Sequence, residues 1–159
     1  MTYRWKMLAI SLTLAAPLVL GQIAVAQTLP TSSGIRVAQR QHEMHAFSDG
    51  GYTYWDALVL ADFWNEGVTD AKWRAGSKLL GPVESKVYLR LVVTDARAKA
   101  LANAESLRLY SDSGFTYDDA ERLARYWGKE NAYDGKLCIE RNLILGNESV
   151  IREALALSR

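Results

Sequence analysis

Residues 48–64 read SDGGYTYWDALVLADFW, and residues 111–127 read SDSGFTYDDAERLARYW. Of the 17 aligned positions, 10 are identical, and two more exchange one aromatic side chain for another. Unrelated sequences would share about one residue over this length, so we interpret the pair as an internal repeat. The rest of the fold can be predicted outward from this repeat.

Both copies carry a helix start signal at the same position. Thr53 is a favourable N-cap residue, and Asp56, three positions later, can bond back to the backbone of Thr53. In the first helical turn, Asp56 would also face the positive end of the helix dipole. Thr116 and Asp119 repeat the arrangement. We therefore expect a capped helix over about 54–64 and a matching helix in the second copy.

Each of these helices also carries a stripe of apolar residues. The spacing i, i+3, i+4, i+7 is typical of the buried face of an amphipathic helix. Alanine within the stripe would let a neighbouring helix approach closely, and tryptophan would fill the remaining space. The two stripes are Ala57, Leu60, Ala61 and Trp64 in the first copy, and Ala120, Leu123, Ala124 and Trp127 in the second.

The opposite faces of the two helices differ. Leu58 and Val59 stand where the second copy has Glu121 and Arg122. The first helix is therefore apolar on two sides, which favours a helix sandwiched inside the domain. The alternative is that this side faces a partner protein. In that case the candidate contact residues are Trp55, Leu58, Val59 and Trp73.

Further helices are predicted around the repeat. A second helix follows a short turn in each copy, and Gly81 and Gly146 stand where helix C-cap glycines are common. Residues 87–93 could form a strand, but the lack of strict alternation favours one long helix through this region. The remaining expected helices are a short one over 38–46, the long one over about 83–104, and a last one over about 148–157.

These elements predict an all-α fold. We expect two tandem similar three-helix units, about 47–104 and 110–159, packed into one small helical domain over residues 38–159. The lead-in, residues 27–37, contains Thr, Pro, Ser and Gly without any period and is expected to be flexible.

The first 26 residues have the pattern of a secretory signal peptide. Arg4 and Lys6 precede an apolar run over residues 7–20, and Ala24 and Ala26 offer the small residues of a cleavage site. A membrane anchor is the alternative, but a run of about 14 residues is shorter than the roughly 20 that a spanning helix needs. We therefore expect cleavage before Gln27, no membrane association afterwards, and a periplasmic or secreted protein.

Charge and cysteine content limit the possible partners. Without Arg4 and Lys6 the chain has 17 basic and 18 acidic residues, a net charge of −1. No excess of positive charge is present for nucleic acid or for an anionic membrane. Cys138, the only cysteine, cannot form an internal disulfide, and its apolar neighbours favour a small buried side chain over a reactive thiol.

The chain lacks the sequence signatures of common catalytic and cofactor sites. No nucleotide-binding glycine loop and no serine-hydrolase or zinc-protease motif is present. His42 and His45 are spaced to share a helix face, but two histidines are too few for a zinc site. We therefore expect no catalytic residue, no metal and no cofactor.

Two functions remain open. The first is an exported, non-catalytic interaction or adaptor module that binds an unknown protein partner or associates with itself. The second is a glycan- or small-ligand-binding protein, possibly a hydrolase, that uses the aromatic and acidic side chains of the two repeated turns. Its candidate site would lie in a cleft between the units and would contain Asp49, Tyr52, Asp112 and Phe115.

Overall fold

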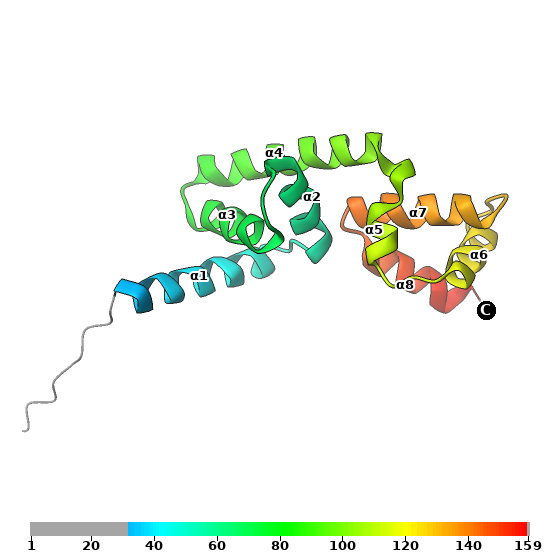
Figure 1. The fold of residues 1–159 in the computed structure, drawn as a ribbon, viewed down its shortest axis with the longest axis horizontal. Helices are drawn as coiled ribbons and strands as arrows, with labels where there is room; N and C mark the ends of the chain where they lie inside the picture. The colour runs from blue at the N-terminus through cyan, green and yellow to red at the C-terminus, as the bar shows by residue number, and fades with distance from the viewer. Residues whose placement is uncertain (1–31, 159) are drawn as a thin grey trace, which may run out of the picture.

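The computed structural model describes residues 32–158 of the chain, which form eight α-helices and one 3-10 helix, with no strand in that part (Figure 1). The predicted signal peptide and residues 27–31 lie outside the described residues. The helices are α1 (Ser32–Asp49), α2 (Tyr54–Trp64), α3 (Val68–Leu80), α4 (Val83–Ala102), α5 (Arg108–Asp112), α6 (Tyr117–Tyr126), α7 (Ala132–Ile144) and α8 (Glu148–Leu157), with the 3-10 helix η1 (Ala104–Ser106) between α4 and α5.

The all-α prediction is confirmed, with one difference in detail. Residues 87–93, which could have formed a strand, are helical as part of the long helix α4, as expected. The first helix begins at Ser32 rather than at 38, so residues 32–37 of the predicted lead-in are helical. The sequence did not predict this start, because residues 32–37 show no clear amphipathic period. None of the described helices combines the length and the apolar character that crossing a membrane requires.

The helices form an elongated body. Figure 1 shows α1, α2 and α3 at one end, α5 to α8 at the other, and α4 running along the top from one end towards the other. Within the first end α1 packs on α3, and α3 also packs on α2 and α4. At the other end α7 packs on α5, α6 and α8, and it also contacts α2 and α4. The contacts of α7 with α2 and α4 therefore join the two ends.

The two capped helices begin as predicted. Thr53 Oγ1 accepts a hydrogen bond from the backbone N–H of Asp56 at 3.2 Å, and Asp56 Oδ2 accepts one from the backbone N–H of Thr53 at 2.8 Å. Thr116 and Asp119 form the same pair of bonds, at 3.1 and 2.9 Å. Because each pair satisfies two N–H groups that have no partner inside the helix, both helix starts are defined locally.

Helix α2 is sandwiched, as its apolar residues on two sides indicated. It packs on α3 and α4 and also contacts α7. Trp55, Leu58 and Val59 are only 5, 6 and 3% exposed. Trp64 and Trp127 are half-buried and pack against the core, where they were expected to fill the space beside the alanines. On the second copy, α6, Glu121 and Arg125 are exposed, whereas Arg122 donates hydrogen bonds to backbone oxygens at the end of α8.

Two glycines permit close helix crossings. A Cβ atom on Gly76 in α3 would lie 1.9 Å from the carbonyl oxygen of Glu43 in α1. A Cβ atom on Gly135 in α7 would lie 2.1 Å from the carbonyl oxygen of Ala120 in α6. No side chain fits at either distance, so the backbones touch directly at both crossings. The tight α1–α3 and α6–α7 pairs are therefore built on these two positions.

Candidate functional site

The predicted partner-contact residues are mostly inside the protein. Trp55, Leu58 and Val59 belong to the core of this chain, so the prediction that they form a docking surface is wrong. The physical reason is that α3, α4 and α7 cover both apolar sides of α2. Trp73 alone of the four reaches the surface, where the guanidinium of Arg40 lies 3.6 Å from its ring centroid.

The four residues of the predicted ligand site do not gather in one place. Asp49 and Asp112 are exposed at the last residues of α1 and α5. Tyr52 stacks on Phe47 with ring centroids 5.6 Å apart, and Phe115 lies 5.4 Å from the guanidinium of Arg152. Each aromatic ring therefore packs against a side chain outside the predicted set. The two carboxylates lie at the ends of different helices.

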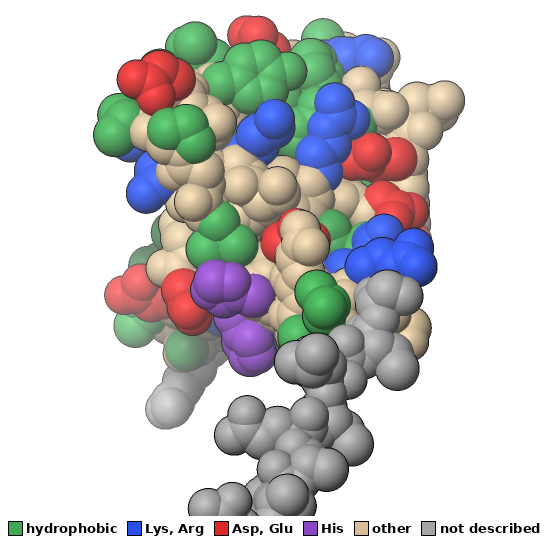
Figure 2. All heavy atoms as spheres, turned by 90° about the vertical axis from the view of Figure 1, so that its left-hand side faces the viewer, with side chains coloured by type: hydrophobic (Ala, Val, Ile, Leu, Met, Phe, Trp, Pro, Cys, Tyr) green, Lys and Arg blue, Asp and Glu red, His purple; other side chains and the backbone are tan. Residues whose placement is uncertain are grey.

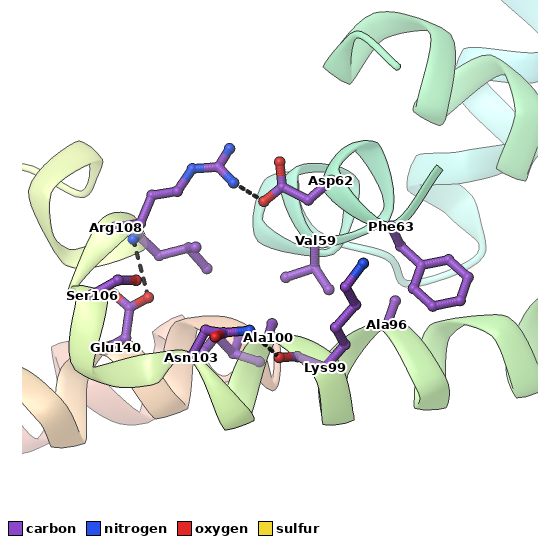
Figure 3. Close-up of a pocket in the computed structure, with 12 residues that line it drawn as sticks. Val59, Asp62, Phe63, Ala96, Lys99, Ala100, Asn103, Ser106, Arg108 and Glu140 are labelled. Atoms are coloured by element: carbon purple, nitrogen blue, oxygen red, sulfur yellow. Dashed lines mark hydrogen bonds and ion pairs between the residues drawn. The ribbon is translucent and has the colours of Figure 1, made fainter. Parts of the chain in front are cut away.

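A cleft of about 240 Å³ does lie between the two ends of the molecule, but other residues form it (Figure 3). Its walls come from α2, α4, the η1–α5 segment and α7. The apolar part consists of Val59, Phe63, Ala96, Ala100, Leu109 and Ile144, and the polar part of Asp62, Lys99, Asn103, Ser106, Arg108 and Glu140. None of the four predicted ligand-site residues lines it.

Helical spacing explains how α2 and α4 line the cleft. Val59, Asp62 and Phe63 lie three and four positions apart on one side of α2. On α4, Ala96, Lys99 and Ala100 follow the same spacing, and Asn103 is the C-cap residue of the helix. The side chains of the two alanines are small, which leaves room for the cleft between these helices.

The two carboxylates of the cleft are already engaged. Asp62 forms an ion pair with Arg108 that joins α2 to α5 across the cleft. Glu140 is 1% exposed and accepts hydrogen bonds from the backbone N–H groups of Leu109, at 3.2 Å, and Tyr110, at 2.6 Å. It thereby satisfies N–H groups of the first turn of α5.

Burial raises the pKa of Glu140 above its ordinary value, and the two backbone hydrogen bonds and Arg108 oppose that shift. The cost of desolvating the carboxylate is therefore only partly offset by its partners. Glu140 acts as a structural cap for α5, with each of its oxygens accepting one backbone hydrogen bond.

Lys99 is the charged group of the cleft that lacks a counter-ion. Its side chain extends from α4 towards Val59 and Phe63 (Figure 3), with the ammonium nitrogen 5.8 Å from the Phe63 ring centroid. Among residues 32–158 no carboxylate lies within ion-pair distance of it. Asn103 donates its side-chain N–H to the backbone oxygen of Lys99 at 3.0 Å, which supports the last turn of α4.

A second surface stands out on the outer side of α4. Val83, Val87 and Leu91 follow a spacing of four and are 68, 46 and 61% exposed. We call these three residues the α4 stripe. Figure 2, which looks onto the end where α3 meets α4, shows hydrophobic side chains gathered along the upper edge of the molecule. Scattered exposed apolar residues are normal, but a stripe along one helix is typical of a contact surface.

The two histidines lie side by side on the surface (Figure 2), as their spacing on α1 predicts. Within the described part of the chain no group of three potential metal-ligating side chains is found. The pair therefore stays two ligands short of a four-coordinate zinc site.

The sequence contains a signal for Glu140. Glu140 follows Ile139 and precedes Leu143 and Ile144 on one helical face, so a carboxylate interrupts an otherwise apolar stripe. Such a group must find hydrogen-bond donors when it is buried. Lys99 and Arg108 carried no comparable signal, because nothing in their own segments shows what lies opposite them.

Comparisons with models of protein families, with curated proteins and with solved structures find no match to this chain.

Proposed function

We propose that the protein is an exported, non-catalytic interaction module that associates with a second copy of itself through the α4 stripe. The observation that carries the proposal is the exposure of Val83, Val87 and Leu91, which form one continuous apolar line over two turns of a single helix. Export rests on the signal-peptide pattern of residues 1–26, which also makes the protein periplasmic or secreted.

The same proposal includes the two tandem three-helix units, α2–α4 and α6–α8. It is supported by the two capping boxes and by the equal length of the helices that follow them, 13 residues in both α3 and α7. In the second unit α8, with 10 residues, takes the place of the 20-residue α4. The α4 stripe lies within the first three turns of α4, the part that corresponds to α8.

The charges beside the stripe favour a second copy as the occupant. With about 100° per residue, Glu84 lies about 60° to one side of Val87, and Arg90 lies about 60° to the other side. Asp95 falls on the side of Glu84, and Lys86 falls on the side of Arg90. One flank of the stripe is therefore acidic and the other basic. None of these four side chains has an ion-pair partner among residues 32–158.

This arrangement of charges also selects the geometry of the pair. In a parallel twofold pair, with the symmetry axis along α4, the acidic flank of one copy lies beside the basic flank of the other. In an antiparallel twofold pair, acid would face acid. We therefore expect a parallel pair in which Val87 and Leu91 each meet their own counterparts and Glu84 lies near the partner's Arg90.

The dimer should be weak. Helix α4 is about 30 Å long. The area that its three-residue stripe can bury is smaller than the roughly 800 Å² per partner that a stable interface buries. Sedimentation equilibrium of the protein, expressed with its own leader and purified from the periplasm, tests the proposal at concentrations from about 10 μM to 1 mM. We expect concentration-dependent dimerisation that Val87→Glu abolishes.

Val150→Glu is the matched control, because Val150 in α8 is 46% exposed, the same as Val87. Dimerisation that survives Val87→Glu, or a wild-type protein that stays monomeric at about 1 mM, contradicts the proposal. In a Cys138→Ser background, Leu91→Cys should cross-link to itself. Cross-linking only between Leu91→Cys and Val83→Cys chains would show an antiparallel pair instead.

A further inference from the structure

The cleft between α2, α4, α5 and α7 is large enough for a small organic molecule. Its volume is about 240 Å³. An apolar cavity of about 150 Å³ accepts benzene, so this cleft has room for a ligand of about ten non-hydrogen atoms. Its size is below the range of sites for drug-sized ligands, which begins at about 300 Å³.

The walls indicate an apolar ligand body. Val59 and Phe63 from α2 face Ala96 and Ala100 of α4 across the cleft, and Ile144 from α7 also lines it. Since Val59 and Ile144 are 3 and 1% exposed, this part is held rigidly by the core. A rigid, apolar wall favours an aromatic ring or a branched alkyl group over a sugar, whose hydroxyl groups would lose their hydrogen bonds to water.

The charges indicate an anionic group at one end. Asp62 and Arg108 neutralise each other, and both oxygens of Glu140 accept backbone hydrogen bonds. The ammonium of Lys99 is the remaining charge, and its side chain extends towards Phe63 (Figure 3). A ligand carboxylate would lie beside Lys99, at the end of the cleft away from Glu140.

We propose that this cleft binds a small monocarboxylate with an aromatic or branched apolar body. The carboxylate pairs with the Lys99 ammonium, and the apolar body lies against Val59, Ala100 and Ile144. The asymmetry of the cleft, with the Lys99 ammonium at one end and the buried Glu140 carboxylate at the other, sets the direction in which the ligand lies. This site is independent of the α4 stripe, because Lys99 and Ala100 line the cleft whereas the stripe lies on the outer side of α4.

Phenylacetate is the probe, and phenylacetamide is its uncharged counterpart of the same shape. We expect phenylacetate to shift the backbone amide NMR signals of Val59, Ala100 and Ile144 with a dissociation constant on the order of 1 mM. Phenylacetamide should bind about 5- to 10-fold more weakly, since the contact to an exposed lysine is partly screened by solvent. Lys99→Gln should reduce phenylacetate binding to the level of the amide.

Two further variants complete the test. Lys129→Gln changes another exposed lysine, which does not line the cleft, and should leave the preference for the acid intact. Ala100→Leu should fill the cleft and weaken both probes, with folding checked by circular dichroism. The proposal is overturned if about 10 mM phenylacetate shifts none of the cleft signals, or if Lys99→Gln keeps the preference for the acid.

Discussion

The indole N–H of Trp55 donates a hydrogen bond to Oε2 of Glu148 at 2.6 Å, across 93 positions of the chain. It joins the first turn of α2 to the first turn of α8, and Glu148 also forms an ion pair with Arg152. With the Asp62–Arg108 pair, it is one of the polar contacts that hold the two ends of the molecule together.

Replacing Trp55 by Phe should remove this hydrogen bond while keeping most of the buried ring. We expect the free energy of unfolding to fall by about 1–3 kcal/mol, because a bond to a charged acceptor is lost. Urea denaturation measures the change. Trp127→Phe is the control, since Trp127 is half-buried but its indole nitrogen has no hydrogen bond within residues 32–158. Equal losses in both variants would show that the bond contributes nothing.

The pKa of Glu148 should make this link sensitive to acid. The hydrogen bond from Trp55 is the largest cause that lowers its pKa below the ordinary value of 4.5, and Arg152 adds to it, while burial opposes both. The stabilisation is therefore complete above pH 4.5 and is lost as the pH falls through the lower pKa of the folded state. Comparison of wild type with Glu148→Gln by urea denaturation should show the wild-type advantage vanishing in acid.

Glu140 should show the opposite dependence. Burial, the largest cause, raises its pKa above 4.5, and hydrogen bonds from Tyr110 and Leu109 only partly counter that. Its protonated form is favoured by folding, so its contribution to stability is largest below pH 4.5 and is lost as the pH rises through the folded-state pKa. Relative to Glu140→Gln, the wild type should lose stability over that range. An unchanged difference from pH 4 upwards would contradict this expectation.

Asp56 and Asp119 occupy matching positions but should differ in importance. Asp56 is 2% exposed and accepts hydrogen bonds from the guanidinium of Arg97 at 2.6 and 3.2 Å, in addition to its bonds with Thr53. The Asp119 side chain is 25% exposed, and its nearest cation, Arg122, lies 3.9 Å away.

Asp56→Ala should therefore reduce the free energy of unfolding by about 3–5 kcal/mol, because the partly buried Arg97 loses its partner. Asp119→Ala should cost only about 1 kcal/mol, the usual value of an N-cap interaction. Urea denaturation of the two variants gives the comparison. Losses of similar size would mean that the Arg97 contact adds nothing to the cap.

The two helix crossings should not tolerate a methyl group. Gly76→Ala and Gly135→Ala each place Cβ about 2 Å from a carbonyl oxygen, so the helices must separate. We expect losses of about 3 kcal/mol or more, or failure to fold. Gly67→Ala is the control, because its Cβ would meet only the end of the Asp70 side chain, at 3.3 Å. Melting temperatures measure all three, and similar values would contradict the close-approach argument.

Short-range features could be read from the sequence because their partners lie within one or two turns. Thr53 with Asp56 and Thr116 with Asp119 form both capping boxes, and the stripe from Ala57 to Trp64 packs inward as expected. The sandwiched position of α2 followed from Leu58 and Val59. The start of α1 was missed, since residues 32–37 have no clear period.

What the sequence determined by itself is the all-helical chain, its two capped helices and the faces that they bury, because these depend on spacings of three and four residues. Which polar groups meet was decided only by the tertiary structure. Trp55 reaches Glu148, Asp62 reaches Arg108 and Glu140 reaches the start of α5 because helices far apart in the chain pack together. The cleft around Lys99 exists for the same reason: its walls come from four separate segments, and no spacing within any one of them records the others.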